Sequence, residues 1–468
     1  MRFVNRKKEL EVLEKENLSK GAKFIVIYGR RRIGKTRLIE EFIKNKKEHI
    51  YYLAADEKDT LQIKELKTLL VDFFHDDFLS SNDFKDWKLL FSYLKKIWPK
   101  NKKIILIIDE VTYILKNNPS FSSYLQQFWD SFLSKTNTML ILSGSLVGLM
   151  LKNVLGENSP LYGRRTAEIF LEEFEIDYVR EFLNKPLEET INFFSVLGGI
   201  PKYLELVKED FNGFLSDIFD KKSFFYREGF YLMTEEFNDI STYSNILKAI
   251  AEGKTKLNEI ADYSGFESKK ISAYLNILES LGFIMSLVPI TKEEKKFRGK
   301  IYLINDSFLE FWFRFINKNR SLIELDKKEY LIKKVDNEIN SFIGRKFEKV
   351  CKQFIILSEK FTLTKIGKQW GKILNMPKDK NQYEIDICAV NEDAQEILFA
   401  ECKWQDKVDA LSVLYELKEK AKYVNWHNQD RKEYYVVFAK SFKERIREKN
   451  IMLFDLKDME NGITQRTK

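Results

Sequence analysis

The first third of the chain contains short apolar runs that are each followed by glycine or polar residues. Residues 23–28 (KFIVIY), 103–108 (KIILII) and 138–142 (TMLIL) are apolar at almost every position. Runs of this length predict strands that are buried on both faces. An amphipathic helical pattern follows the first run, and its apolar face consists of Leu38, Ile39, Phe42 and Ile43. Alternating strands and helices predict an α/β layer with a parallel sheet.

The middle of the chain has a helical pattern between Tyr243 and Gly282. Apolar residues recur at helical spacing in consecutive short segments, the last of which begins at Ser268 and stops before Gly282. Apolar runs at residues 284–290 and 300–304 then predict a hairpin. This spacing is that of a helix-turn-helix followed by a wing.

The pattern changes again from about Asn337. A helix with an apolar stripe precedes predicted strands at residues 382–387, 398–404 and 434–438, with a further helix at residues 409–421. Strands mixed with helices in this way predict a second α/β/α layer. We therefore expect a multidomain α/β protein.

The composition is that of a folded protein without long linkers. Of the 468 residues, 44% are hydrophobic and 32% are charged, and there are 19 glycines and 7 prolines. A chain of this length is expected to hold about three domains at roughly 150 residues each. Its net charge of +8 permits a nucleic-acid partner but does not demand one, because solvated surface lysines also account for it.

The cysteines and histidines show no zinc-binding spacing. The cysteines are Cys351, Cys388 and Cys402, and isolated reduced thiols are typical of a cytoplasmic protein. No apolar segment follows the charged start, so no signal peptide is predicted. The apolar residues 139–151 are too few to span a bilayer. We expect a cytoplasmic protein without a membrane partner.

A phosphate-binding motif follows the first predicted strand. Residues 29–36 (GRRRIGKT) fit GxxxxGK[ST] and lie between a strand and a helix, as this motif requires. The glycines let backbone N–H groups wrap a phosphate at a helix N-terminus. Lys35 would neutralise the terminal phosphates of ATP, and the Thr36 hydroxyl would bind Mg²⁺. The residues that we expect at the nucleotide are Gly29, Arg30, Arg31, Arg32, Ile33, Gly34, Lys35, Thr36 and Arg37.

Polar residues also follow the next two predicted strands. Asp109 and Glu110 form a Walker B arrangement, in which Asp109 would hold Mg²⁺ and Glu110 would polarise the attacking water. Ser143 would orient water near the γ-phosphate, or would simply cap a helix. Arg164 and Arg165 would reach the γ-phosphate as an arginine finger, in cis or from a neighbouring subunit, or would be surface charges.

With further motifs, these segments resemble the archaeal ATPase family, whose members are AAA+/STAND-like P-loop ATPases. The matching segments are residues 3–10 (FVNRKKEL), 28–36 (YGRRRIGKT), 109–110 (DE), 143–145 (SGS), 160–166 (PLYGRRT) and 198–204 (GGIPKYL). The resemblance covers about the first 235 residues. It implies that residues 3–10 lie near the adenine and that the Gly-Gly-Ile-Pro turn belongs to a helical lid. It also supports the winged helix, which members of this family commonly carry.

The predicted winged helix has basic residues that would contact DNA. Lys269, Lys270 and Asn276 would face the groove, while Lys296 and Arg298 of the wing would contact phosphates. The alternative is a protein-contact or lid module, because glutamates dilute the positive charge of this segment.

The last third of the chain contains an acid and an acid-x-lysine pattern on neighbouring predicted strands. Glu401 and Lys403 share one face of their strand, where Asp386 of the adjacent strand can meet them. Such carboxylates bind a divalent cation, and the lysine stabilises developing charge. With Glu348 on the preceding helix, the pattern resembles the PD-(D/E)XK nuclease fold over about the last 130 residues. The resemblance implies a second Mg²⁺ or Mn²⁺ site formed by Glu348, Asp386 and Glu401. Glu384 and Asp386 are alternative ligands or surface acids. A nuclease-like fold can also have lost its activity, or can bind nucleic acid without cleaving it.

We therefore predict a P-loop ATPase core in residues 1–170, a helical lid in 171–238, a winged helix in 239–320 and a nuclease-like domain in 335–468. The predicted function is that of an ATP- and Mg²⁺-dependent switch coupled to binding of double-stranded DNA and to metal-dependent DNA cleavage. One alternative is a STAND-type signalling ATPase with an inactive nuclease-like domain, which would form nucleotide-dependent homo-oligomers. The other is a DNA-binding regulator without enzymatic activity.

Overall fold

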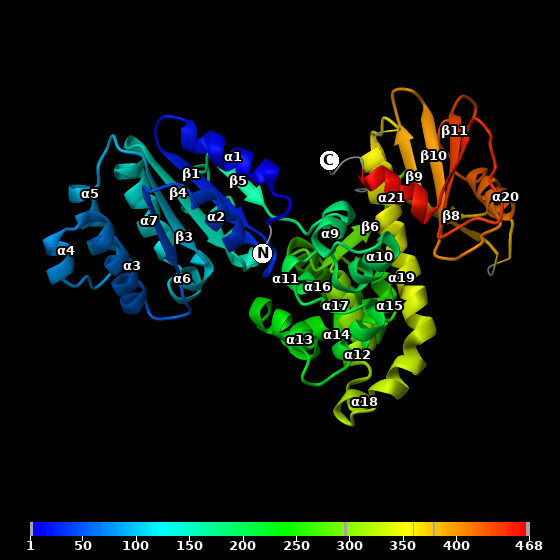
Figure 1. Ribbon diagram of the computed structural model, residues 1–468, viewed down its shortest axis with the longest axis horizontal. Coiled ribbons are helices and arrows are strands. Elements are labelled where there is room, and N and C mark those ends of the chain that lie inside the picture. Colours follow the sequence, from blue (N-terminus) through cyan, green and yellow to red (C-terminus); the bar gives the residue numbers. More distant parts are fainter. Residues whose placement is uncertain (1–2, 294–296, 359, 378–379, 465–468) are drawn as a thin grey trace. The chain divides into compact units, whose positions relative to one another are not determined.

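The computed structural model describes residues 3–293, 297–358, 360–377 and 380–464. These described residues divide into two compact units. The first comprises the chain up to Glu173 together with Ile200–Lys202, and the second comprises Phe174–Gly199 with the chain from Tyr203 onward. Figure 1 shows the helices and strands of both units.

The first unit is built on a parallel sheet with the strand order β2-β3-β4-β1-β5 within the described residues (Figure 1). The strands are β1 (Lys23–Tyr28), β2 (His49–Leu53), β3 (Ile104–Asp109), β4 (Thr138–Gly144) and β5 (Ala167–Phe170). The apolar runs of the sequence form β1, β3 and β4, which lie side by side in the middle of the sheet. Because neighbouring strands run parallel, the loops that follow them all emerge at one edge.

Helices connect these strands. They are α1 (Lys7–Leu18), α2 (Lys35–Ile43), α3 (Asp59–Phe74), α4 (Asp77–Ser81), α5 (Trp87–Ile97), α6 (Val111–Asn117), α7 (Phe121–Ser131) and α8 (Val147–Met150), with short η1 (Leu133–Lys135) and η2 (Leu151–Leu155).

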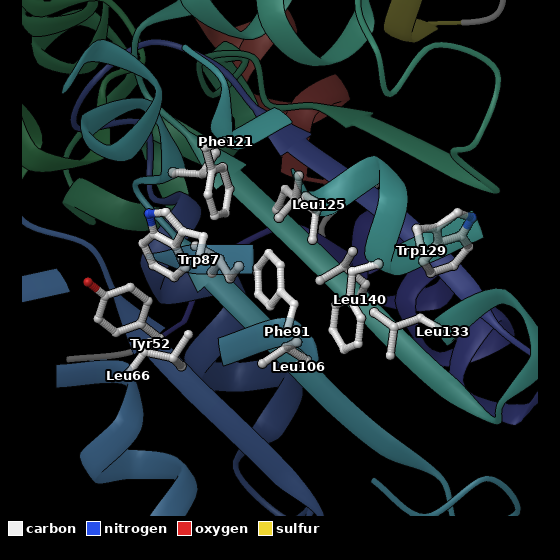
Figure 2. Packing of buried hydrophobic residues seen from close by; sticks show 14 of the residues in the cluster. Tyr52, Leu66, Trp87, Phe91, Leu106, Phe121, Leu125, Trp129, Leu133 and Leu140 are labelled. Carbon is white, nitrogen blue, oxygen red and sulfur yellow. The ribbon is translucent and has the colours of Figure 1, made fainter. Parts of the chain in front are cut away.

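The core of the first unit packs α3, α5 and α7 on the sheet. Figure 2 shows Trp87 and Phe91 of α5 beside Phe121 and Leu125 of α7, over Leu106 of β3. The ring centroids of Trp87 and Phe121 are 4.8 Å apart, in an edge-to-face arrangement. Full burial of an apolar side chain of this size contributes roughly 1.5–3 kcal/mol. This packing fixes the strands whose carboxyl ends carry the predicted nucleotide motifs.

The second unit begins with helices and a hairpin. The helices are α9 (Ile176–Leu183), α10 (Leu187–Leu197), α11 (Pro201–Leu204, whose first residues belong to the first unit), α12 (Phe211–Ile218), α13 (Phe224–Glu236), α14 (Ile240–Ala251), α15 (Leu257–Ser264) and α16 (Ser268–Ser280). The antiparallel hairpin of β6 (Ile284–Leu287) and β7 (Ile301–Ile304) follows. The first hairpin strand is shorter than the predicted residues 284–290. Its continuation leaves the hairpin because the Ile290 amide donates to the carbonyl oxygen of Lys368, at 3.1 Å.

A long helix leads into the last part of the second unit. After α17 (Ser307–Phe311), the π-helical η3 (Trp312–Asn317) and α18 (Arg320–Glu324), helix α19 spans Lys328–Ser358. It begins earlier than the pattern change at about Asn337, because Leu331 and Val335 already continue its buried stripe.

The C-terminal sheet has the strand order β12-β11-β10-β9-β8 in the described part of the chain (Figure 1). Its elements are β8 (Lys365–Lys372), β9 (Gln382–Asn391), β10 (Glu396–Lys403), α20 (Ala410–Ala421), β11 (Lys432–Ala439), β12 (Ile451–Phe454) and α21 (Leu456–Thr464). The β8, β9 and β10 strands pair antiparallel, whereas β10, β11 and β12 pair parallel. Strand β8 was not expected from the sequence, because this edge strand reads KIGKQWGK and lacks an apolar alternation.

Candidate functional site

The predicted nucleotide motifs meet at the carboxyl edge of the first sheet. In the strand register, Tyr28 of β1 pairs with Gly144 of β4, and Ile108 of β3 pairs with Leu142 of β4. The residues that follow β1, β3 and β4 therefore lie at the same level. Parallel α/β sheets bind ligands at this edge.

The loop between β1 and α2 has the backbone of a phosphate cradle. Gly34 precedes α2 with φ 94°, which favours glycine. Gly29 has φ 152°, and a Cβ there would lie 2.6 Å from the carbonyl oxygen of Leu171. The Lys35 side chain is 4% exposed, and its Nζ donates to the carbonyl oxygens of Gly29 (3.0 Å) and Arg30 (3.1 Å). An ammonium group is thus held inside the curve of the loop, where a phosphate would be neutralised.

Thr36 and Asp109 come together beside this loop. The Thr36 hydroxyl donates to Asp109 Oδ2 at 2.8 Å, and the Tyr51 hydroxyl donates to the same oxygen at 2.9 Å. Asp109 is fully buried. Burial, and then the Asp109 charge, raise the pKa of Tyr51 well above its usual value, so Tyr51 stays a donor. A hydroxyl and a carboxylate are oxygen ligands of the type that Mg²⁺ prefers, so these residues fit a nucleotide-bound magnesium ion.

Glu110 is held by Ser145 and not by Ser143. Glu110 begins the turn into α6 with φ 51°, a left-handed conformation that is rare outside glycine. Its Oε2 accepts from the Ser145 hydroxyl at 2.6 Å and from the Ser145 amide at 3.2 Å. Ser143, which the sequence favoured, is fully buried, and its hydroxyl has no hydrogen-bond partner in the described residues. The predicted water-orienting role of Ser143 stays a prediction, and Ser145 is the residue that the geometry adds.

The arginine pair has carboxylate partners within the first unit. Arg164 Nε and Nη2 donate to the two carboxylate oxygens of Asp130, at 2.8 and 2.7 Å. Arg165 Nε lies 2.7 Å from Glu168. Both contacts match the surface-charge alternative, and the arginine-finger role of either residue stays a prediction.

Arg6 reaches the phosphate loop from the N-terminal segment. Its guanidinium is buried, and Nη2 donates to the carbonyl oxygens of Ile33 (3.3 Å) and Glu172 (2.6 Å). Asn5 and Arg6 are both left-handed, with φ 62° and 69°. No role was predicted for Arg6 itself from the sequence. The only signal was its place in the segment that resembles the archaeal ATPases.

The other arginines of the loop differ in their surroundings. Arg31 donates to the Tyr113 hydroxyl on α6. The Arg32 carbonyl oxygen accepts from the amide of Lys202, at 3.4 Å. Arg37 points outward on α2 and pairs with Glu40 at 3.2 Å, with both side chains about half exposed.

The predicted DNA-contacting residues of α16 are accessible. Lys269, Lys270 and Asn276 are exposed, and Lys270 Nζ lies 5.1 Å from the ring centre of Phe266. Arg298 is also exposed, whereas Lys296 lies outside the described residues.

The predicted acidic residues of the C-terminal sheet lie close together in the register. Ala400 pairs with Ile387, so Glu401 and Asp386 come next on their strands, and the Cys402 amide donates to Asp386 Oδ2 at 2.9 Å. Glu401 is 5% exposed. Its Oε1 accepts from Lys420 Nζ of α20 (2.6 Å) and Lys403 Nζ (3.4 Å), whereas its Oε2 is buried without a partner among the described residues.

Glu348 approaches the same region from α19. Lys368 of β8 donates to Glu348 at 3.0 Å and contacts Glu384 at 2.6 Å. Burial raises the pKa of Glu348 to about 7 against the opposing effect of Lys368, and the charges of Asp386 and Glu384 add to the rise. Lysines hold these carboxylates, and no group of three or more His, Cys, Asp or Glu side chains in the described residues is arranged to hold a metal ion. The buried, partnerless Glu401 oxygen is the feature that fits a cation there.

Two models of known protein families match separate parts of the chain. Residues 3–207 match a model of an ATPase domain predominantly from Archaea. Residues 312–424 match a model described as archaeal and bacterial proteins of unknown function. In the described residues, no helix combines the length and apolar character needed to cross a bilayer.

Similar proteins come from archaea. The uncharacterized protein MJECL04 of Methanocaldococcus jannaschii is 35% identical over 468 residues, which cover 97% of this chain and 99% of that protein. The uncharacterized ATP-binding protein MJ0423 of the same organism is 58% identical over 45 residues, or 10% of this chain and 76% of that protein.

Two solved structures are also similar. The Walker-type ATPase PABY2304 of Pyrococcus abyssi has 21% identity and a TM-score of 0.48, over 67% of this chain and 96% of its own. The ORC2 protein of Aeropyrum pernix, in its ADPNP-ADP complexes, has 13% identity and a TM-score of 0.43, over 69% of this chain and 94% of its own.

Proposed function

The chain belongs to the same family as MJECL04 and carries an archaeal-type ATPase domain, and from this we propose that it is a magnesium-dependent ATPase acting as a nucleotide-controlled switch. The observation that carries the proposal is the 2.8 Å hydrogen bond from the Thr36 hydroxyl to the Asp109 carboxylate. Thr36 directly follows Lys35 in the sequence. Strand β3 brings Asp109 to the P-loop from a position 73 residues away in the sequence. Side chains of these types at this edge of a parallel sheet are suited to bind and hydrolyse ATP.

Each residue has a separate role in this proposal. The amides of the loop and the Lys35 ammonium bind the phosphates, and Lys35 exchanges its carbonyl partners for phosphate oxygens. Thr36 and Asp109 would hold Mg²⁺, which neutralises charge on the phosphates when bound. Glu110 orients the attacking water and accepts its proton, and Ser145 positions the Glu110 carboxylate.

Phosphate release from ATP tests the enzymatic part of the proposal. We expect turnover in the presence of Mg²⁺, with loss of nucleotide binding in Lys35→Ala and loss of turnover with retained binding in Glu110→Gln. Lys44→Ala is the matched control, because Lys44 follows the same helix and its side chain is 64% exposed. Equal turnover in Glu110→Gln and in the unmodified protein would refute the catalytic assignment.

The switch part of the proposal rests on contacts to the phosphate loop from distant segments. Arg6 donates to the Ile33 carbonyl oxygen, and the Lys202 amide donates to that of Arg32. A change in the conformation of the loop would therefore alter the hydrogen bonds of both segments. We include nucleotide-dependent assembly, in which Arg164 would leave Asp130 to reach a neighbouring subunit. Light scattering tests this step: ATP should increase the mass of the unmodified protein and leave Lys35→Ala unchanged. A constant mass in all nucleotide states would refute assembly.

A second candidate function is metal-dependent cleavage of DNA by a nuclease-like domain in residues 335–468. It is supported by the buried, partnerless Oε2 of Glu401, with Asp386 next to it in the strand register and Lys403 on the same strand face. Asp386 and Glu401 would hold Mg²⁺ or Mn²⁺, and Glu348 would join them after leaving Lys368, to which it is bound in the structure. Lys403 would stabilise charge on the scissile phosphate.

Plasmid nicking in the presence of Mn²⁺ tests this function. We expect loss of nicking in Asp386→Ala and in Lys403→Ala. Asp393→Ala, in the exposed turn between β9 and β10, and Lys418→Ala, on α20, are the matched controls. Nicking that persists in both test variants, or that is absent from the unmodified protein, would refute cleavage by this domain.

We further propose that α14–α16 with the β6–β7 hairpin form a winged helix that binds double-stranded DNA, and that α9–α13 form a lid. The exposure of Lys269, Lys270 and Asn276 on α16 supports the DNA surface. Binding of duplex DNA should fall steeply with salt, because phosphate contacts release counterions. It should be lost in Lys269→Glu with Lys270→Glu and retained in the control pair Lys221→Glu with Lys222→Glu. Equal binding by both pairs would reject this surface.

A further inference from the structure

A cavity of about 570 Å³ lies within the second unit and shares no lining residue with the sites described above. It is lined by residues of α13, α14, η3 and the start of α18. Ligand pockets for small molecules typically have about 300–1,000 Å³. The size alone therefore admits a ligand of nucleotide dimensions.

The wall of this cavity depends on a close fit between two elements. A Cβ on Gly229 of α13 would lie 2.2 Å from the indole ring of Trp312, so only glycine lets the two approach in this way. The Trp312 Nε1 donates to the carbonyl oxygen of Tyr226, at 2.9 Å, which fixes the indole. Trp312 begins the π-helical η3, and π-helical turns are rare and are found frequently at functional sites.

Aromatic side chains and cations line the cavity together. Trp312, Tyr226, Phe230 and Tyr231 provide rings, and Phe230 and Tyr231 are each 47% exposed. The described residues that line the cavity include Arg227 and Arg320 but no aspartate or glutamate. The lining therefore offers stacking surfaces and positive charge.

The two arginines differ in how far neighbouring side chains hold them in place. Arg320 Nε donates to the Tyr226 hydroxyl at 3.0 Å, and its guanidinium lies 5.7 Å from the Tyr226 ring centre and 3.7 Å from Glu324. Arg227 is exposed on α13. Arg320 thus belongs to the wall, and Arg227 is available for an anion at the rim. Neutral hydrogen-bonding groups on the α14 side come from Ser241, Ser244 and Asn245.

We propose that this cavity binds a nucleotide unit, with the base stacked on the aromatic wall and the phosphate at Arg227. Aromatic rings stack with any base, and a guanidinium matches the geometry of a phosphate. The serines and Asn245 would contact the polar edge of the base. The same chemistry is present in a free mononucleotide and in one residue of a single-stranded nucleic acid, and the experiment separates these sources. The proposal does not depend on ATP hydrolysis.

The test uses the full chain with Lys35→Ala, so that the phosphate loop does not contribute. The probes are AMP with a fluorescent N-methylanthraniloyl group and a fluorescein-labelled oligothymidylate of eight nucleotides, each followed by fluorescence anisotropy. In this background, Tyr231→Ala and Arg227→Glu should each weaken binding by roughly tenfold or more. Tyr330→Ala and Arg447→Glu are the matched controls, because both residues are exposed and lie outside the cavity lining.

Each outcome decides between sources or rejects the site. Binding of the AMP probe that both test variants weaken supports a free mononucleotide, and the same result with the oligothymidylate alone supports a single-stranded nucleic acid. Absence of binding for both probes would overturn the proposal. So would binding that the control variants weaken equally, or oligothymidylate binding that responds only to Lys269→Glu with Lys270→Glu.

Discussion

The serine pair at the end of β4 offers a direct test of how Glu110 is positioned. Ser143 and Ser145 are both fully buried and are separated by one residue. The Ser145 hydroxyl donates to Glu110 Oε2 at 2.6 Å, while the Ser143 hydroxyl has no partner among the described residues. Replacement of each by alanine removes the same hydroxyl at two buried positions, one near the end of β4 and one directly after that strand, so the two variants differ mainly in the lost contact.

The size of the effect follows from the hydrogen bond. A hydroxyl at 2.6 Å from a carboxylate lies in the short, charge-assisted range, and a hydrogen bond to a charged group contributes about 1.5–3 kcal/mol. If Ser145→Ala loses that energy in the transition state, kcat falls by roughly 10- to 150-fold, since 1.36 kcal/mol corresponds to tenfold. The Ser145 amide still reaches Glu110 at 3.2 Å, which favours the lower end.

For Ser143→Ala we expect the opposite pattern. Loss of a buried hydroxyl without a partner removes a desolvated polar group, so stability should stay equal or rise by about 1 kcal/mol. Turnover should stay within about twofold, which corresponds to less than 0.5 kcal/mol.

The assay is steady-state phosphate release at saturating Mg²⁺-ATP, with urea unfolding of each variant as the control for stability. A fall in kcat for Ser145→Ala at unchanged KM supports the positioning role. A larger loss of kcat in Ser143→Ala than in Ser145→Ala would refute the reasoning and would favour Ser143 as the residue that orients water.

Three further predictions follow from the structure. The first two concern single residues and are measured by urea unfolding, and the third concerns divalent cations. Arg6→Ala should lower the free energy of unfolding by about 2 kcal/mol, because the carbonyl groups of Ile33 and Glu172 that it binds are left unsatisfied. Replacement of the exposed Arg37 by alanine should change that free energy by less than about 0.5 kcal/mol, and equal effects of the two variants would contradict a stabilising role of the Arg6 contacts. Gly229→Ala should destabilise by about 1–3 kcal/mol because its Cβ meets the Trp312 ring, while Gly344→Ala, in helix α19 with its nearest contact at 3.6 Å, should stabilise by up to about 1 kcal/mol, and the reverse order would refute the packing argument. Chelation of divalent cations should stop ATP turnover, and addition of Mg²⁺ should restore it. Turnover that persists after chelation would refute the assignment of a magnesium-dependent ATPase.

The local sequence already located the central strands of the first unit and the phosphate loop. The runs that form β1, β3 and β4 are apolar throughout because both faces of a central parallel strand are buried. Gly34 and Lys35 were recognisable because the loop needs a left-handed residue and a cation at fixed spacing. The edge strand β8 was not recognisable. It pairs with a neighbouring strand on one side only, and its sequence is polar and rich in glycine and lysine.

Side-chain partners could not be read from the sequence. The sequence pointed to Ser143, whereas the turn of the chain after β4 brings Ser145 to Glu110. Arg164 lies near Asp130 because α7 packs beside the loop that carries the arginine, a contact across 34 residues.

The sequence by itself determined the motifs whose function depends on spacing along the chain: the phosphate loop, the acids after β3 and the acid-x-lysine pair of β10. These are short-range properties, because one strand or one loop places all of their atoms. Only the tertiary structure decided which groups meet across elements, such as Thr36 with Asp109, Arg6 with Ile33, and the arginine-lined aromatic cavity beside η3. Such contacts arise when separate elements bury a common apolar surface, and the resulting packing places side chains that no sequence period links.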